Sequence, residues 1–179
     1  MSQKHKVFIS FHSADIKYKD EFEKLFHYTF DIIVSRSVQE NDISNNVSTE
    51  TVRQKIRDEY LRDSTVTVVL IGANTWQRKH VDWEISSSIR KTEFSSRSGL
   101  LGILLPTHPS YLKEHYNPYI IPPRLYDNLK CGFAGMYDWS TNPEIIQTRI
   151  HAAFSRRDNM IPDNSYPSFA NNRSGEKWV

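Results

Sequence analysis

Residues 65–89 constrain the fold of this chain more than any other part of its sequence. The stretch begins with a nearly unbroken apolar run, typical of a central strand covered on both faces: Val66, Val68, Val69, Leu70 and Ile71. Residues 72–74 interrupt that run, and Asn74 with Gln77 three residues later indicates the start of a helix. This helix has an apolar face that repeats every four residues, formed by Val81, Ile85 and Ile89. The stretch therefore predicts a strand–turn–helix unit.

The rest of the chain alternates strands and helices in the same way. Apolar runs predict strands at residues 7–11, 32–34, 100–105 and 135–139. Apolar stripes with spacings of three and four predict helices that begin after residue 13, at about residue 49, and at residue 143. Because this alternation is typical of parallel strands with helical crossovers, we expect a three-layer α/β domain of the flavodoxin-like class, with about five parallel strands and helices on both faces of the sheet.

Two segments do not follow the alternation. Residues 106–130 contain five prolines and four tyrosines, so we expect an ordered loop without a regular element, because proline removes backbone donors and fixes φ. This loop is either a lid over a site or a surface for self-association, and both roles stay open. Residues 157–179 are polar, and we expect them to form an extended or partly disordered tail after a single domain at residues 1–156.

Composition argues against several classes of function. The net charge is +2 and no basic run is longer than two residues, so we expect no nucleic-acid partner. A single cysteine cannot form an internal disulfide, and the seven histidines show no HxxxH or HxH spacing, so we expect no metal site. No apolar segment has the length of an export signal or a membrane span, and we therefore expect a cytoplasmic protein without a membrane partner.

The carboxylate of Glu84 is the strongest candidate for chemistry. Glu84 lies on the helix predicted to leave the carboxyl end of the central strand, where open α/β sheets bind their ligands. By the same rule, residues that follow the first and second strands lie nearby and are candidates for binding a substrate: Ser10, Phe11, His12, Asp15, Arg36 and Ser37. Four residues close to Glu84 in the sequence complete the predicted set: Asn74, Trp76, His80 and Trp83. Each residue of the set also has an ordinary structural interpretation as a helix cap, a loop residue or core packing.

The sequence lacks the motifs of several enzyme classes. There is no GxGxxG after the first strand, no GxxxxGK[ST] and no GxSxG. One carboxylate is too few for ordinary glycoside hydrolysis, which requires an acid and a second carboxylate. It is sufficient where the leaving group departs without protonation, as neutral nicotinamide departs from NAD. Glu84 would then hold the ribose and stabilise an oxocarbenium-like transition state, with Trp76 or Trp83 stacked on a ring of NAD. NAD would be the substrate, and no cofactor is expected.

The sequences VFISFHSAD (residues 7–15) and VTVVLIGANTWQRKHVDWEI (residues 66–85) resemble the Toll/interleukin-1 receptor (TIR) domain. They resemble more closely the bacterial TIR-like proteins of the Thoeris anti-phage system, of the ThsB type, over residues 6–105. The resemblance implies a flavodoxin-like fold and an NAD nucleosidase or ADP-ribosyl cyclase activity, with Glu84 as the catalytic residue. It also implies a phage-derived trigger and a diffusible product, either a cyclic ADP-ribose isomer or an ADP-ribose conjugate, that activates a separate effector protein.

The chain departs from the family pattern at two places. His80 occupies a position where many members carry tryptophan, and the loop after the second strand lacks the Arg-Asp-x-x-Pro-Gly pattern of receptor-type adaptors. Two other functions stay open beside NAD cleavage. One is a non-enzymatic TIR-type interaction module that binds through its loop and helix surfaces. The other is an enzyme like the nucleoside deoxyribosyltransferases, which also pair this kind of sheet with one glutamate.

Overall fold

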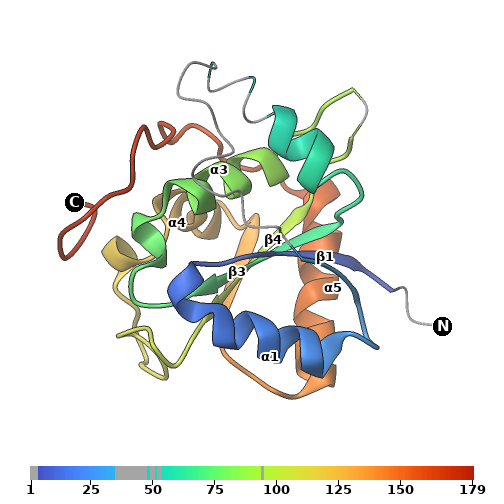
Figure 1. Cartoon of the computed structure of the whole chain (residues 1–179). Coiled ribbons are helices and arrows are strands. Elements are labelled where there is room, and N and C mark those ends of the chain that lie inside the picture. The colour runs from blue at the N-terminus through green and yellow to red at the C-terminus, as the bar shows by residue number, and fades with distance from the viewer. Residues whose placement is uncertain (1–3, 35–47, 49–50, 52–53, 94) are drawn as a thin grey trace.

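The computed structural model describes residues 4–34, 48, 51, 54–93 and 95–179. Its five strands form one parallel sheet in the order β2-β1-β3-β4-β5 (Figure 1). The strands are β1 (Lys6–Ser10), β2 (Asp31–Val34), β3 (Val66–Ile71), β4 (Gly99–Leu104) and β5 (Ala134–Asp138). The parallel direction and this strand order are those of the flavodoxin-like class, so the predicted fold is confirmed.

Helices connect the strands and cover the sheet. The α-helices are α1 (Ile16–Phe26), α3 (Lys79–Ser88), α4 (Pro123–Lys130) and α5 (Pro143–Asn159). Short turns of 3-10 helix occur at η1 (Ser13–Asp15), η3 (Thr75–Gln77) and η4 (Pro118–Ile120), and a π-helical turn at η2 (Ile56–Tyr60). The helix predicted from residue 49 falls partly on residues outside the described ranges, and its described part contains η2. Among the described residues, no helix combines the length and apolarity needed to cross a membrane.

The two faces of the sheet have separate cores. Helices α1 and α5 cover one face, and α3 and α4 cover the other (Figure 1). The predicted apolar face of α3 is confirmed, since Val81, Ile85 and Ile89 are all buried. Because successive side chains of a strand point to opposite faces, Ile9 packs in the core beneath α1 and α5 while Ser10 faces α3. The end of β1 therefore presents a hydroxyl, rather than an apolar side chain, to α3.

The predicted start of the helix after β3 is wrong in its position. The chain first makes the turn η3, and α3 begins only at Lys79. Asn74 precedes η3 but its side chain makes no capping hydrogen bond. The hydroxyl of Thr75 instead accepts a hydrogen bond from the backbone N–H of Gly72 at 2.9 Å, which closes the turn at the end of the strand. Asp15 similarly precedes α1 without capping it.

The prediction that residues 106–130 contain no regular element is also wrong. Helix α4 begins at Pro123, where proline is tolerated because the first N–H groups of a helix have no partner within it. Residues 106–122 are an ordered loop that His108 holds together. Nδ1 of His108 accepts a hydrogen bond from the backbone N–H of Ser110, and Nε2 donates to the carbonyl of Ile120, each at 3.0 Å.

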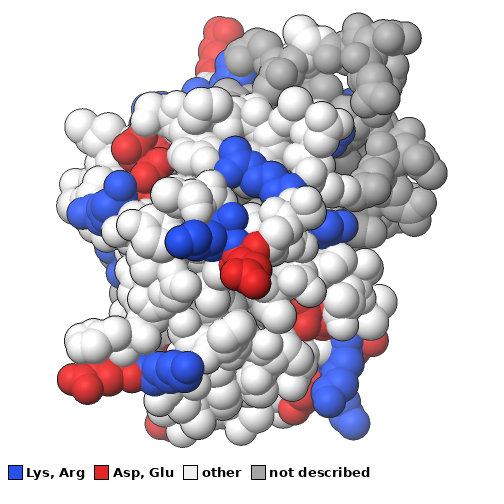
Figure 2. All heavy atoms as spheres, turned by 90° about the vertical axis from the view of Figure 1, so that its left-hand side faces the viewer, with Lys and Arg blue, Asp and Glu red and all other residues white. Residues whose placement is uncertain are grey.

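Residues 160–179 contain no helix or strand, but they are bound along α3 and α4 (Figure 1). The backbone N–H of Lys79 donates to the side chain of Asn172 at 2.9 Å, so a distant residue caps the start of α3. The indole N–H of Trp178 donates to the carbonyls of Pro118 and Ile121 at 3.0 Å. On the face shown in Figure 2, charges of both signs are interspersed among other residues. The extended C-terminal residues thus have specific contacts with the domain.

Candidate functional site

The carboxylate of Glu84 lies inside the domain, at the carboxyl end of β1. Glu84 is 1% exposed and Ser10, the last residue of β1, is 0% exposed. The Ser10 hydroxyl donates a hydrogen bond to Oε2 of Glu84 at 2.5 Å. Strands β1 and β3 are neighbours in the sheet and α3 follows β3, so the topology places a residue of the first strand against this helix. The structure thus brings together two residues of the predicted set.

His80 joins the same region one helical turn before Glu84. Its Nε2 lies 2.9 Å from the backbone carbonyl of Phe11, and because a carbonyl only accepts, Nε2 carries the proton. The Phe11 side chain packs in the core beneath α1 and α5, so this residue contributes its carbonyl to the region near Glu84. The contact between His80 and Phe11 fixes the first turn of α3 against the chain that leaves β1.

Asp15 lies where the carboxyl ends of β1, β3 and β4 meet. It is 5% exposed, and the hydroxyl of Thr107 donates to its Oδ1 at 3.1 Å. A β-carbon at Gly72 would overlap the Asp15 carboxylate, so only glycine leaves room for it. Thr107 was not predicted as a site residue. It follows β4 by three residues, and the rule that selected Ser10 and Asp15, that ligands bind beyond the carboxyl ends of strands, also applies to Thr107.

The structure directs Trp83 away from Glu84. Its indole N–H donates to the carbonyl of Phe169 at 2.9 Å, and Nζ of Lys79 lies 4.7 Å from the centroid of its ring. Successive residues of a helix point about 100° apart, so Trp83 and Glu84 face different sides of α3. Trp83 lies on the side covered by the C-terminal residues.

The remaining predicted residues have varied surroundings. Trp76 is buried in η3, whereas Asn74 is exposed beside it. His12 is half-buried, with Nδ1 3.5 Å from the hydroxyl of Ser13. Arg36 and Ser37 lie outside the described residues. The substrate-binding roles of these five residues stay predictions.

A second buried acid on α3, Asp82, was not singled out from the sequence. It is 1% exposed, and its Oδ1 accepts a hydrogen bond from Nε of Arg124 at 3.0 Å. Its Oδ2 accepts from the backbone N–H of Phe169, also at 3.0 Å. The sequence gives little sign of this arrangement, because it depends on contacts with α4 and with residues more than eighty positions away.

The arrangement around Glu84 suits the stabilisation of a positive charge. A carboxylate removed from bulk water interacts more strongly with a developing cation than an exposed one does, because water screens it less. The Ser10 hydroxyl holds one oxygen, which restricts the orientation of the group. Among the described residues, no cluster of three or more His, Cys, Asp or Glu side chains has the arrangement of a metal site.

Comparison with protein families gives a match. The family model described as Thoeris protein ThsB, TIR-like domain, matches residues 8–110, which is more than half of the chain. No curated protein matches the chain. The matched region contains the residues that meet at the carboxyl ends of the strands: Ser10, Asp15, His80, Glu84 and Thr107.

Proposed function

We propose that this chain, which belongs to the Thoeris ThsB TIR-like domain family and so to a defence system, is an NAD-cleaving enzyme whose catalytic residue is Glu84. The observation that carries the proposal is the buried hydrogen bond from Ser10 to Glu84 at the carboxyl end of β1. It holds the Glu84 carboxylate where open α/β sheets bind ligands, within the region that the family model matches.

The proposed reaction breaks the bond between nicotinamide and the ribose of NAD. The electron pair of that bond moves into the pyridinium ring, so nicotinamide leaves as a neutral molecule without needing an acid. Positive charge then develops on the ribose carbon and its ring oxygen. The Glu84 carboxylate stabilises this oxocarbenium-like state electrostatically, and a nucleophile adds to the ribose carbon and gives up its proton.

The other residues of the site have supporting roles in this proposal. The Ser10 hydroxyl orients Glu84, and the bond from His80 to the Phe11 carbonyl fixes α3 beside β1. Asp15, held by Thr107, is placed to bind a hydroxyl or an amide of the substrate. A suitably placed acceptor decides the product: attack by the adenine end of the same molecule gives a cyclic ADP-ribose isomer, and attack by a second molecule gives an ADP-ribose conjugate.

The product then acts on a separate effector protein, in response to phage infection. In this scheme the chain needs no direct contact with its effector. The trigger acts before NAD cleavage, so we expect activity in infected cells or after the protein is mixed with a lysate of infected cells.

The test is release of nicotinamide from NAD in lysates of phage-infected cells that produce the protein. We expect Glu84→Gln, which keeps the size of the side chain and removes its charge, to lower the rate by about 10³-fold or more. Glu93→Gln removes an exposed carboxylate from the segment after α3, and we expect it to leave the rate unchanged.

Equal nicotinamide release by the wild-type and Glu84→Gln proteins would overturn the role of Glu84. Protection from phage by Glu84→Gln at the wild-type level would favour the interaction module instead. Turnover of deoxynucleosides without NAD would favour the deoxyribosyltransferase-like enzyme.

A further inference from the structure

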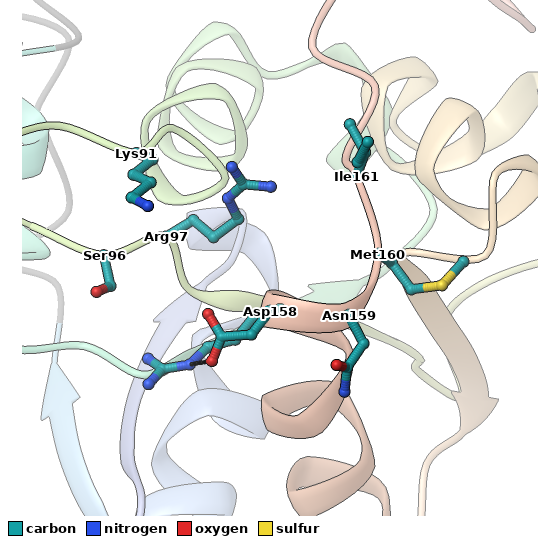
Figure 3. A pocket seen from close by; sticks show the side chains of 8 residues that line it. Lys91, Ser96, Arg97, Asp158, Asn159, Met160 and Ile161 are labelled. Carbon is teal, nitrogen blue, oxygen red and sulfur yellow. Dashed lines mark ion pairs between the residues drawn. The ribbon is translucent and has the colours of Figure 1, made fainter.

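A polar cavity of about 270 Å³ lies at the opposite end of the strands from Glu84. Two segments line it (Figure 3). The first joins α3 to β4 and contributes Lys91, Ser96 and Arg97. The second runs from the last turns of α5 through residue 161. Because β4 begins at Gly99, the cavity lies at the amino ends of the strands, whereas Ser10 and Glu84 meet at the carboxyl ends.

The lining of the cavity has an excess of positive charge. It contains the cations Lys91, Arg97 and Arg157 and one carboxylate, that of Asp158, whose Oδ2 lies 3.5 Å from Nε of Arg157. Within the part of the chain that the structure describes, neither Lys91 nor Arg97 forms an ion pair. Several cations that line one hollow favour a ligand with more than one negative charge.

A buried arginine contacts both ends of the segment that joins α3 to β4. The Arg57 side chain is 0% exposed, and its Nη1 donates to the Ser88 carbonyl and the Ser98 hydroxyl at 3.4 and 3.3 Å. The backbone N–H of Ser98 also donates to the Ser88 carbonyl, at 2.7 Å, so Arg57 holds the base of the loop that carries Lys91 and Arg97. Among the described residues, Nε and Nη2 of Arg57 have no hydrogen-bond partner.

The surroundings of Arg57 disfavour its charged form. Burial lowers the pKa of Arg57 to about 10, and Arg157, which lines the cavity, acts in the same direction, while Asp58 acts against them. A buried cation without a full set of partners is unfavourable, and a nearby anion would offset this cost.

We propose that this cavity binds a small anion of the diphosphate class, held by Lys91, Arg97 and Arg157. The volume is below the range of sites for drug-sized ligands, about 300–1,000 Å³, so the bound group is small. The three cations come from two segments and lie apart around the cavity (Figure 3). A diphosphate, whose oxygens are spread over two phosphates, therefore suits them better than a single carboxylate, and it also suits the paired N–H groups of arginine. This site is separate from that of NAD cleavage and does not depend on it.

The test is calorimetric titration of the full chain with pyrophosphate. We expect saturable binding at one site, weakened about tenfold or more in the double variant Lys91→Ala/Arg97→Ala. Neither side chain makes an ion pair in the described part of the chain, so their removal leaves the fold intact. The control Lys24→Ala/Lys113→Ala removes two exposed lysines elsewhere, and we expect an affinity within about twofold of wild type.

Two further measurements complete the test. Glu84→Gln should bind pyrophosphate as the wild type does, because Glu84 lies at the carboxyl ends of the strands and the cavity at their amino ends. Inorganic phosphate should bind more weakly than pyrophosphate, since it reaches fewer of the cations. The proposal is overturned if pyrophosphate shows no saturable binding up to about 10 mM. It is equally overturned if the two double variants bind alike, or if phosphate binds as tightly as pyrophosphate.

Discussion

Helix α3 carries two buried acids, two residues apart, in opposite surroundings. Asp82 faces α4 and the C-terminal residues, where Arg124 and the backbone N–H of Phe169 bind its two oxygens. Glu84 faces the end of β1, where the Ser10 hydroxyl binds Oε2. Both residues are 1% exposed. Burial therefore does not separate an acid with a structural role from a candidate for catalysis, and the partners do.

The two sides of α3 differ in what they contribute. The Asp82 side joins α3 to α4 through a buried ion pair, in which loss of one partner leaves an uncompensated charge. The Glu84 side joins α3 to the carboxyl end of β1. The Ser10 hydroxyl donates to Glu84, and the His80 imidazole donates to the Phe11 carbonyl. We therefore expect substitutions on the Asp82 side to change mainly the free energy of unfolding, and those on the Glu84 side to change mainly the rate of NAD cleavage.

The largest expected effect on stability comes from Arg124→Ala. It leaves the Asp82 carboxylate buried without its cation, and we expect the free energy of unfolding to fall by about 3–5 kcal/mol. Urea denaturation followed by circular dichroism measures this change. Lys130→Ala is the control, because it breaks an exposed ion pair with Asp127 on the same helix and should leave the free energy of unfolding nearly unchanged. Similar losses in both variants would contradict a special role for the buried pair.

Ser10→Ala tests the Glu84 side. It removes a donor from a buried carboxylate, an interaction of about 1–3 kcal/mol, and we expect nicotinamide release to slow by about tenfold. The matched control is Ser86→Ala on α3, since the Ser86 hydroxyl is buried and has no hydrogen-bond partner among the described residues. We expect that variant to keep the wild-type rate. An unchanged rate in Ser10→Ala would show that Ser10 does not orient Glu84.

Asn172→Ala tests whether the C-terminal residues support α3. Asn172 accepts a hydrogen bond from the N–H of Lys79, and loss of such a cap costs about 1 kcal/mol. Thermal and urea unfolding both measure this loss. Asn171→Ala, at the exposed neighbouring position, should have an effect below about 0.5 kcal/mol. If the two variants unfold alike, the cap does not contribute to stability.

The sequence predicts one side of α3 much better than the other. The apolar repeat of Val81, Ile85 and Ile89 and the rule for strand ends depend on local periodicity and on the class of sheet, and they placed Glu84 near Ser10 correctly. The partners of Asp82 could not be predicted this way, because Arg124 lies on a helix that the sequence pattern does not predict, and Phe169 lies in a segment without helix or strand. For the same reason, the packing of Trp83 beneath the C-terminal residues could not be predicted.

Helix α4 is not predicted, for a different reason. The prolines of residues 106–130 argue against any regular element. Pro123, however, stands in the first turn of α4, where a missing N–H costs nothing. Helix α4, which carries Arg124, therefore begins at proline, a residue that disrupts the interior of a helix. Proline is compatible with this helix because Pro123 lies in its first turn.

The smallest expected effect is a dependence of the free energy of unfolding on pH. It involves the loop that leads into α4, the helix that carries the partner of Asp82. Burial lowers the pKa of His108 below its usual 6.5, and its hydrogen bond to the Ile120 carbonyl offsets part of this change. In the neutral ring, Nδ1 accepts from Ser110 and Nε2 donates to Ile120, so protonation of Nδ1 breaks the first bond. The unfolded chain takes up this proton more readily, so the stabilisation is present above pH 6.5 and is lost as the pH falls below it.

We therefore expect urea unfolding at pH 7.5 and at pH 5.5 to show lower stability at the acidic pH, and a smaller difference in His108→Gln. Part of the difference remains in that variant, because burial lowers the pKa of His5 as well, with His151 and Arg157 adding to the effect. His115→Gln, at an exposed position, should keep the full wild-type difference. Because the loop that His108 orders leads into α4, acid should weaken the contacts of Asp82 before those of Glu84. An unchanged pH difference in His108→Gln would assign the acid sensitivity to another part of the molecule.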